Sequence, residues 1–180
     1  MRRLAKWTVF IVALAIVGGI VASQYSNHPG PGSFWIEALS RFGAVPADIL
    51  AFPGFDKLER RPTGNDALVC PKDRCKVAVD IEPPVFDMPA TELLARLRKI
   101  ALVEARTIEL KTAPEDNVRA DFQQASATFR FPDIITAEIT SLGPQRSTLA
   151  IWSRSVVGRK DFGVNRARVE RWLKALQSTS

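Results

Sequence analysis

Residues 125–151 read ASATFRFPDIITAEITSLGPQRSTLAI, and this stretch decides the fold class. Apolar residues occupy every second position over residues 125–131, 135–139 and 149–151, which is the spacing of strands with one buried face. Turn-forming pairs, Pro132-Asp133 and Gly143-Pro144, separate the three runs. The pattern therefore predicts three antiparallel strands joined by two hairpins.

The register of these strands follows from burial, because a slip of one residue would turn each apolar set toward water. We expect Phe129 to pair with Ala137, and Ala137 to pair with Ile151. On the opposite face of the sheet, which we expect to be uncovered, one row then consists of Arg130, Thr136 and Trp152, with Arg154 nearby.

The flanking sequence supplies the other elements. Apolar residues recur every three or four positions over residues 87–104 and 164–177, which predicts two helices, and alternation predicts strands over residues 76–81 and 107–112. This order implies an α+β fold. We expect a two-layer sandwich in which two helices cover one face of a mostly antiparallel sheet of about five strands, preceded by an N-terminal transmembrane helix.

The N-terminus reads MRRLAKWTVFIVALAIVGGIVAS, in which a cationic start precedes an uncharged apolar run over residues 7–23. Such a run suits a bilayer, and the preceding positive charge predicts that this end stays in the cytoplasm. The run is slightly shorter than the roughly 20 residues that span a membrane, and residues 21–23 resemble a cleavage site. Two interpretations stay open: a single-pass inner-membrane anchor with a periplasmic C-terminal domain, or a signal peptide whose cleavage releases a periplasmic protein.

Three regions follow from this pattern. Residues 1–23 form the anchor or signal peptide, residues 24–65 form a linker with a short amphipathic helix over residues 33–43, and residues 66–180 form the globular domain. The net charge is +6, of which the basic residues of the first region supply three, leaving +3 for residues 24–180. That charge is too small to indicate nucleic-acid binding, so no nucleic-acid partner is expected.

Cys70 and Cys75 are the only cysteines. In an oxidising compartment this spacing predicts a disulfide that closes a tight loop. A redox pair is the alternative, but such pairs usually have two residues between the cysteines rather than four.

Residues 153–169, SRSVVGRKDFGVNRARV, resemble the C-terminal signature of the domain of unknown function 1499 family, R-S-x-x-G-x-x-D-x-G-x-N-R-x-R-V. Residues 129–133 and 65–71 resemble further elements of that family, so the similarity covers about residues 65–177. Family members are mostly small bacterial envelope proteins with no assigned activity. The resemblance therefore implies a fold and its boundaries, and it leaves the function open.

The signature places charged and polar residues where a strand turns into a helix, and these candidate ligand-binding residues are Arg154, Arg159, Asp161, Asn165 and Arg166. Backbone N–H groups at a helix N-terminus attract anions, and guanidinium groups grip phosphate or carboxylate. An anionic lipid head group is therefore one candidate ligand. The alternative is structural: Asp161 caps the helix and pairs with Arg159 or Arg166, while Asn165 fixes the loop.

The row that contains Arg130, Trp152 and Arg154 is the second candidate surface. An exposed Trp between arginines suits an envelope protein or a glycan. Its structural alternative pairs Arg130 with Glu138 or Asp133 across a hairpin and covers Trp152 with residues 33–43.

No catalytic residue, metal site or cofactor is predicted. A serine nucleophile would need a base, and the only histidine, His28, lies in the linker. The sequence therefore favours an uncharacterised membrane-anchored envelope protein that binds or scaffolds a partner. The alternative is a hydrolase of envelope polymer that uses carboxylates near the helix start, such as Asp133 and Asp161.

Overall fold

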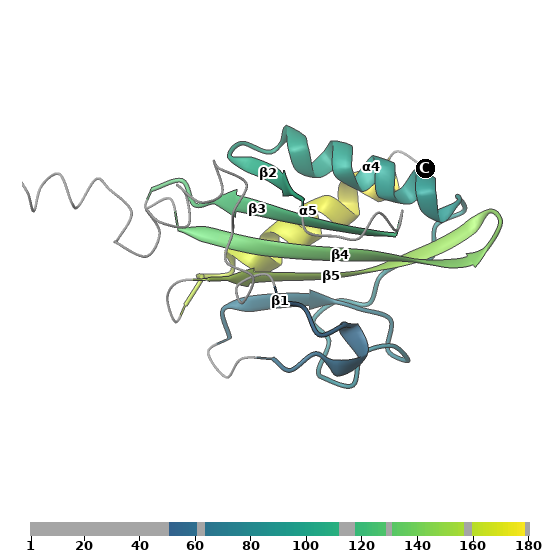
Figure 1. Cartoon of the computed structure of the whole chain (residues 1–180), viewed down its shortest axis with the longest axis horizontal. Coiled ribbons are helices and arrows are strands. Elements are labelled where there is room, and N and C mark those ends of the chain that lie inside the picture. Colours follow the sequence, from purple (N-terminus) through teal and green to yellow (C-terminus); the bar gives the residue numbers. More distant parts are fainter. Residues whose placement is uncertain (1–50, 61–63, 112–117, 129–130, 157–159, 179–180) are drawn as a thin grey trace, which may run out of the picture.

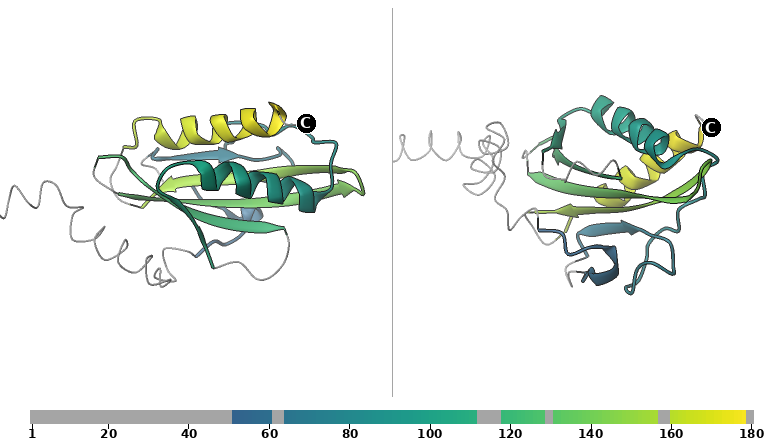
Figure 2. Two further views of the ribbon diagram at one scale, coloured as in Figure 1. Left: turned by 90° about the horizontal axis from the view of Figure 1, so that it is seen from above. Right: turned by 45° about the vertical axis from the view of Figure 1, so that its right-hand side comes forward.

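The computed structural model describes residues 51–60, 64–111, 118–128, 131–156 and 160–178. Their elements in chain order are η1 (Phe55–Lys57), β1 (Asp66–Val69), α4 (Ala90–Val103), β2 (Thr107–Leu110), β3 (Arg119–Ala125), β4 (Pro132–Gly143), β5 (Arg146–Ser155) and α5 (Val164–Ser178). The strands form one antiparallel sheet in the order β1-β5-β4-β3-β2, and both helices pack on one face of it (Figures 1 and 2). The predicted α+β class, with five antiparallel strands and two helices, is confirmed.

The main core lies between the two helices and the sheet. The helix stripes predicted from the sequence are buried there, including Leu93, Leu97 and Trp172. Trp172 meets the ring of Phe122 from β3 edge-on, with the ring centroids 5.6 Å apart. The middle of this face of β4 and β5 is apolar at every second residue, as the alternation predicts, with Ile135, Ala137, Ile139, Leu149 and Ile151 buried there.

The register of β4 and β5 is confirmed, because Ala137 pairs with Ile151 and Thr136 pairs with Trp152. The position of the preceding strand was predicted wrongly: β3 ends at Ala125, and Ala120 rather than Phe129 pairs with Ala137.

The physical reason for this error is that β3 buries polar residues on both of its faces. Asp121 and Gln123 are buried on one face, and Gln124 is buried on the other. Alternation of apolar and polar residues is therefore weak in β3. Pro132 and Asp133, predicted as a turn, are instead the first two residues of β4.

The first strand was also predicted wrongly. β1 (Asp66–Val69) takes the edge position, and residues 76–81 contribute only a single bridge, between Ile81 and Val69. All four residues of β1 are buried, so this strand has no exposed face and no alternating pattern.

A second apolar cluster covers the sheet face opposite the helices. Its buried members are Phe55, Leu58, Leu68, Cys70, Cys75, Ala150 and Trp152. Two of these, Phe55 and Leu58, precede Asp66, the residue at which the sequence analysis placed the start of the globular domain. Within the described ranges, neither helix is long and apolar enough to cross a bilayer; the apolar run over residues 7–23 and the helix predicted over residues 33–43 lie outside those ranges.

Candidate functional site

A buried arginine organises the start of α5. The side chain of Arg168 is 1% exposed, and its guanidinium donates four hydrogen bonds. The acceptors are Gln124 Oε1 at 2.7 Å, Ser153 Oγ at 2.7 Å, Asn165 Oδ1 at 2.6 Å and Asp133 Oδ2 at 2.6 Å. A buried charge is tolerated when a counter-ion and hydrogen bonds compensate it, and Arg168 has both.

Asn165 connects this arginine to β5 and to the segment before β1. Its Nδ2 group donates to the backbone oxygen of Asn65 at 3.1 Å and to Ser155 Oγ at 3.0 Å, while its Oδ1 accepts from Ser153 Oγ at 2.7 Å. Ser155 Oγ in turn donates to Asp133 Oδ1 at 2.7 Å. The amide therefore joins α5 to β5 and to the residue before β1.

Glu104, directly after α4, extends this network to the surface. Its carboxylate accepts hydrogen bonds from Gln124 at 2.7 Å and from Arg171 at 3.1 Å. Burial acts to raise the pKa of Glu104, but the bonds from Arg171 and Gln124 outweigh it, so the pKa lies below its ordinary value.

Asp161 caps α5. Its Oδ1 accepts the N–H of Gly163 at 3.1 Å, and its Oδ2 accepts the N–H of Asn165 at 2.9 Å. The capping role is therefore confirmed. Arg166, however, pairs with Glu170 at 2.9 Å rather than with Asp161, and Arg159 lies outside the described residues.

The predicted candidate residues do not meet in one ligand site. Asn165 is fully buried, Asp161 is occupied by backbone N–H groups, and Arg154 points to the opposite face of the sheet. The helix start is therefore mainly a structural junction.

Trp152 is 6% exposed, so the expectation of an exposed Trp is wrong. Phe52 covers it, with the ring centroids 6.3 Å apart, and the guanidinium of Arg154 stacks 4.0 Å from the centroid of the indole. Asp121, not Arg130, is the β3 partner of Thr136 in this row. Residues 51–58 fold over this part of the sheet, although the sequence analysis placed them in the linker.

Arg60, which the sequence analysis missed, holds this covering segment in place. Its guanidinium forms ion pairs with Asp66 and Asp80, both at 2.9 Å. The hydrogen bond to Asp66 is the main reason that the pKa of Arg60 lies above its ordinary value. Asp66 Oδ2, which also accepts a hydrogen bond from Arg60 Nε, accepts the indole N–H of Trp152 at 2.8 Å.

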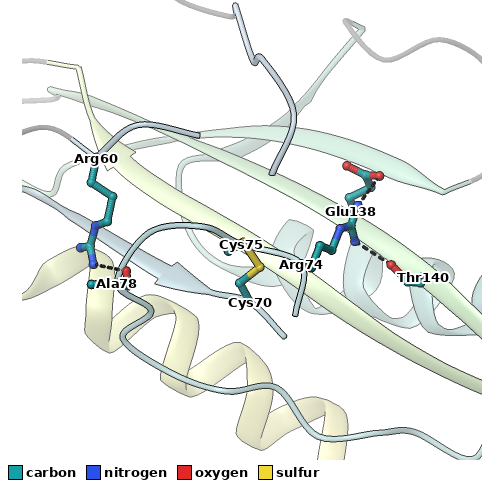
Figure 3. Close-up of a disulfide and its surroundings, with 7 residues drawn as sticks. All are labelled: Arg60, Cys70, Arg74, Cys75, Ala78, Glu138 and Thr140. Atoms are coloured by element: carbon teal, nitrogen blue, oxygen red, sulfur yellow. Dashed lines mark hydrogen bonds and ion pairs between the residues drawn. A yellow bond between two sulfur atoms is a disulfide. The ribbon is translucent and has the colours of Figure 1, made fainter. Parts of the chain in front are cut away.

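The predicted disulfide between Cys70 and Cys75 is confirmed. It closes the loop that carries Arg74, whose guanidinium crosses to β4 (Figure 3). There it pairs with Glu138 and donates to Thr140 Oγ1 at 2.6 Å.

A groove of about 800 Å³ opens beside this loop, on the sheet face opposite the helices. Its walls come from the disulfide loop, from residues 82–85 and from the hairpin end of β4 and β5. The apolar lining residues are Pro71, Pro83, Val85, Ile139 and Leu142. The charged lining residues are Asp73, Glu82, Glu138 and Arg74. Sequence reasoning missed this groove because its walls come from two distant parts of the chain, joined for example by the contact between Arg74 and Thr140, which are 66 residues apart.

A model of the family described as protein of unknown function (DUF1499) matches residues 61–176. The chain belongs to the DUF1499 family. The crystal structure of protein MLL2253 from Mesorhizobium loti is similar at 15% identity and a TM-score of 0.38, over 54% of this chain and 98% of that chain. No curated protein matches the sequence.

The polar residues of the stretch that resembles the DUF1499 signature now have a structural explanation. Ser155, Asn165 and Arg168 form the buried network, and Asp161 caps the helix that carries two of them. The polar residues of the signature therefore stabilise the junction between α5 and the sheet.

Replacing Asp161 by Ala should lower the free energy of unfolding by about 1 kcal/mol, because two N–H groups at the start of α5 lose their acceptor. The matched control is Lys160→Ala, an exposed neighbour whose loss should cost less than about 0.5 kcal/mol. Urea unfolding followed by circular dichroism measures both. Equal stability of the two variants would show that the cap contributes nothing.

Proposed function

We propose that this DUF1499 protein is a binding module of the cell envelope that recognises a protein partner through the groove beside the disulfide loop. Residues 7–23 anchor it in the inner membrane with the domain on the periplasmic side, or direct its export before cleavage. The observation that carries the proposal is the groove of about 800 Å³, which lies within the size range of ligand sites.

The lining of the groove favours a protein partner over an anionic ligand. Three of the four charged side chains that line it are acidic; the basic one, Arg74, is paired with Glu138, and Glu82 is paired with Lys72 at 2.8 Å, so the lining keeps a net negative charge. A phosphate or carboxylate ligand would meet repulsion there. Val85 and Leu142 are each 48% exposed, and they offer apolar contacts to a segment that also carries positive charge.

The groove is also formed in advance of binding. The disulfide fixes both ends of the loop, and Arg74, directly before Cys75, ties the loop to β4 through Glu138 and Thr140 (Figure 3). A wall that is already ordered loses little conformational entropy when a partner binds. This arrangement supports a recognition surface with a defined shape.

No observation favours the hydrolase alternative. Asp133 accepts hydrogen bonds from Ser155 and Arg168 inside the fold, and Asp161 accepts two backbone N–H groups at the start of α5. Both carboxylates are thus occupied by structural donors.

Site-specific photocrosslinking in intact membranes tests the proposal. A benzophenone amino acid at Leu142, on the rim of the groove, should give one discrete adduct with a protein partner. The same probe at Val103, which is 78% exposed on α4, is the matched control and should give none.

A second variant tests the chemistry of the lining. Glu82→Lys in the Leu142 probe background should weaken the adduct, whereas Glu170→Lys on α5 should leave it unchanged. Identical adduct patterns from Leu142 and Val103, or an adduct that Glu82→Lys does not affect, would count against binding in the groove.

A further inference from the structure

The turn before α5 presents an aromatic side chain to solvent. Phe162 is 93% exposed and has a φ of 53°, a left-handed conformation that bulky residues rarely adopt. Its neighbour Val164 is 47% exposed. An exposed ring on a strained backbone does not stabilise the folded domain. The arrangement therefore points to a contact with something outside the domain.

The turn is held firmly in this conformation. Asp161 accepts the N–H groups of Gly163 and Asn165, which lie on either side of Val164. Asn165 is itself fixed in the buried network with Ser153 and Ser155. A preorganised turn therefore carries the ring of Phe162. Because the turn is already ordered, little conformational entropy is lost when the ring makes a contact outside the domain.

One exposed lysine near this ring can attract an anionic surface. Lys160 is exposed two residues before Phe162, whereas Arg166, in the first turn of α5, is exposed but paired with Glu170. The single acid of the turn, Asp161, directs its two carboxylate oxygens to backbone N–H groups. Aromatic rings settle at the boundary between lipid and water, and nearby lysine and arginine side chains are attracted to anionic lipids.

We propose that the turn formed by residues 160–164 contacts the surface of an anionic lipid bilayer, with Phe162 inserted at the level of the head groups. Lys160 supplies the electrostatic attraction, and Phe162 and Val164 supply the apolar contact. This contact is separate from the groove and does not depend on a protein partner.

Such a contact also sets the direction in which the groove faces. The turn follows the end of β5, whereas the groove lies at the hairpin between β4 and β5, at the other end of the strands (Figure 1). Ten residues of β5 span roughly 33 Å. A domain that rests on the bilayer through Phe162 therefore holds its groove away from the lipid, open to the aqueous side.

Spin labelling of the full-length protein tests the contact. The native cysteines are joined in a disulfide, so Val164→Cys can be labelled selectively with a nitroxide while Phe162 is kept. On vesicles of phosphatidylcholine mixed with phosphatidylglycerol, we expect the label to lose collisions with a water-soluble nickel reagent and to gain collisions with oxygen. A label at Val103→Cys, on α4, is the control and should stay accessible to nickel.

Two further variants, each in the Val164→Cys background, separate the roles of the ring and the charge. Phe162→Gly relieves the left-handed backbone and keeps the fold, yet it should abolish the immersion of the label. Lys160→Glu should also reduce it. The proposal is overturned if the labels at positions 164 and 103 behave alike on anionic vesicles, or if immersion persists in Phe162→Gly. Immersion that is equally deep on pure phosphatidylcholine would overturn the requirement for anionic lipid.

Discussion

Replacing Arg168 by Met is expected to lower the free energy of unfolding by about 3–5 kcal/mol, because the change leaves the carboxylate of Asp133 buried without its counter-ion. The same change removes a donor from Ser153, Asn165 and Gln124. Guanidinium chloride unfolding, followed by the fluorescence of the buried Trp172, measures the effect.

The matched control is Arg166→Met, two residues earlier on the same helix. Arg166 is exposed and forms only a surface pair with Glu170, so its loss should cost less than about 0.5 kcal/mol. A double variant, Arg168→Met with Asp133→Asn, should recover part of the loss because no buried charge then lacks a partner. If Arg168→Met and Arg166→Met are equally stable, the buried network does not hold α5 to the sheet.

Replacing Trp152 by Ala should cost a similar amount, about 3–5 kcal/mol, since a large buried side chain leaves a cavity. The indole contacts Phe52 and Arg154, and its N–H group bonds to Asp66, so three separate segments lose a shared partner. Thermal and urea unfolding measure the loss.

Trp152→Phe distinguishes packing from hydrogen bonding. It keeps an aromatic ring and loses the N–H bond to Asp66, whose carboxylate still pairs with Arg60, so it should cost only about 1–2 kcal/mol. A Trp152→Ala variant as stable as the parent protein would contradict the burial of Trp152 beneath Phe52.

The sequence predicted those elements in which one face is apolar and the other is polar. Both helices satisfy this condition, as does β4, in which Ile135, Ala137 and Ile139 alternate with Thr136 and Glu138, and these helices and the pairing of β4 with β5 were placed correctly. β1 and β3 do not, because β1 has three apolar residues in succession and β3 carries buried polar residues such as Asp121 and Gln124. A pattern of hydrophobicity cannot detect a strand whose buried polar side chains form hydrogen bonds inside the protein.

The candidate site was predicted less well, for a related reason. Charged residues near a helix start suggest a ligand, yet here they lie inside the protein or in a helix cap. One signal could have revealed this. Asn165, Arg168, Trp172 and Leu176 follow the three-to-four-residue spacing of the buried stripe, which places the two polar residues on the core side of α5. The groove had no such signal, because its walls meet only in the folded chain.

The position of β1 at the sheet edge has a consequence for the order of events in synthesis. In the part of the chain that is described, β1 pairs as a strand only with β5, and the backbone oxygen of Asn65 accepts a hydrogen bond from the side chain of Asn165, 100 residues later. A chain that emerges N-terminus first must therefore keep β1 without its partner strand until β5 has been made or translocated. Loss of only the last helix should leave β1 beside β5 without the bond from Asn165 and without the core side chain of Trp172, and the apolar face exposed in this way would make the product a substrate for quality-control proteases.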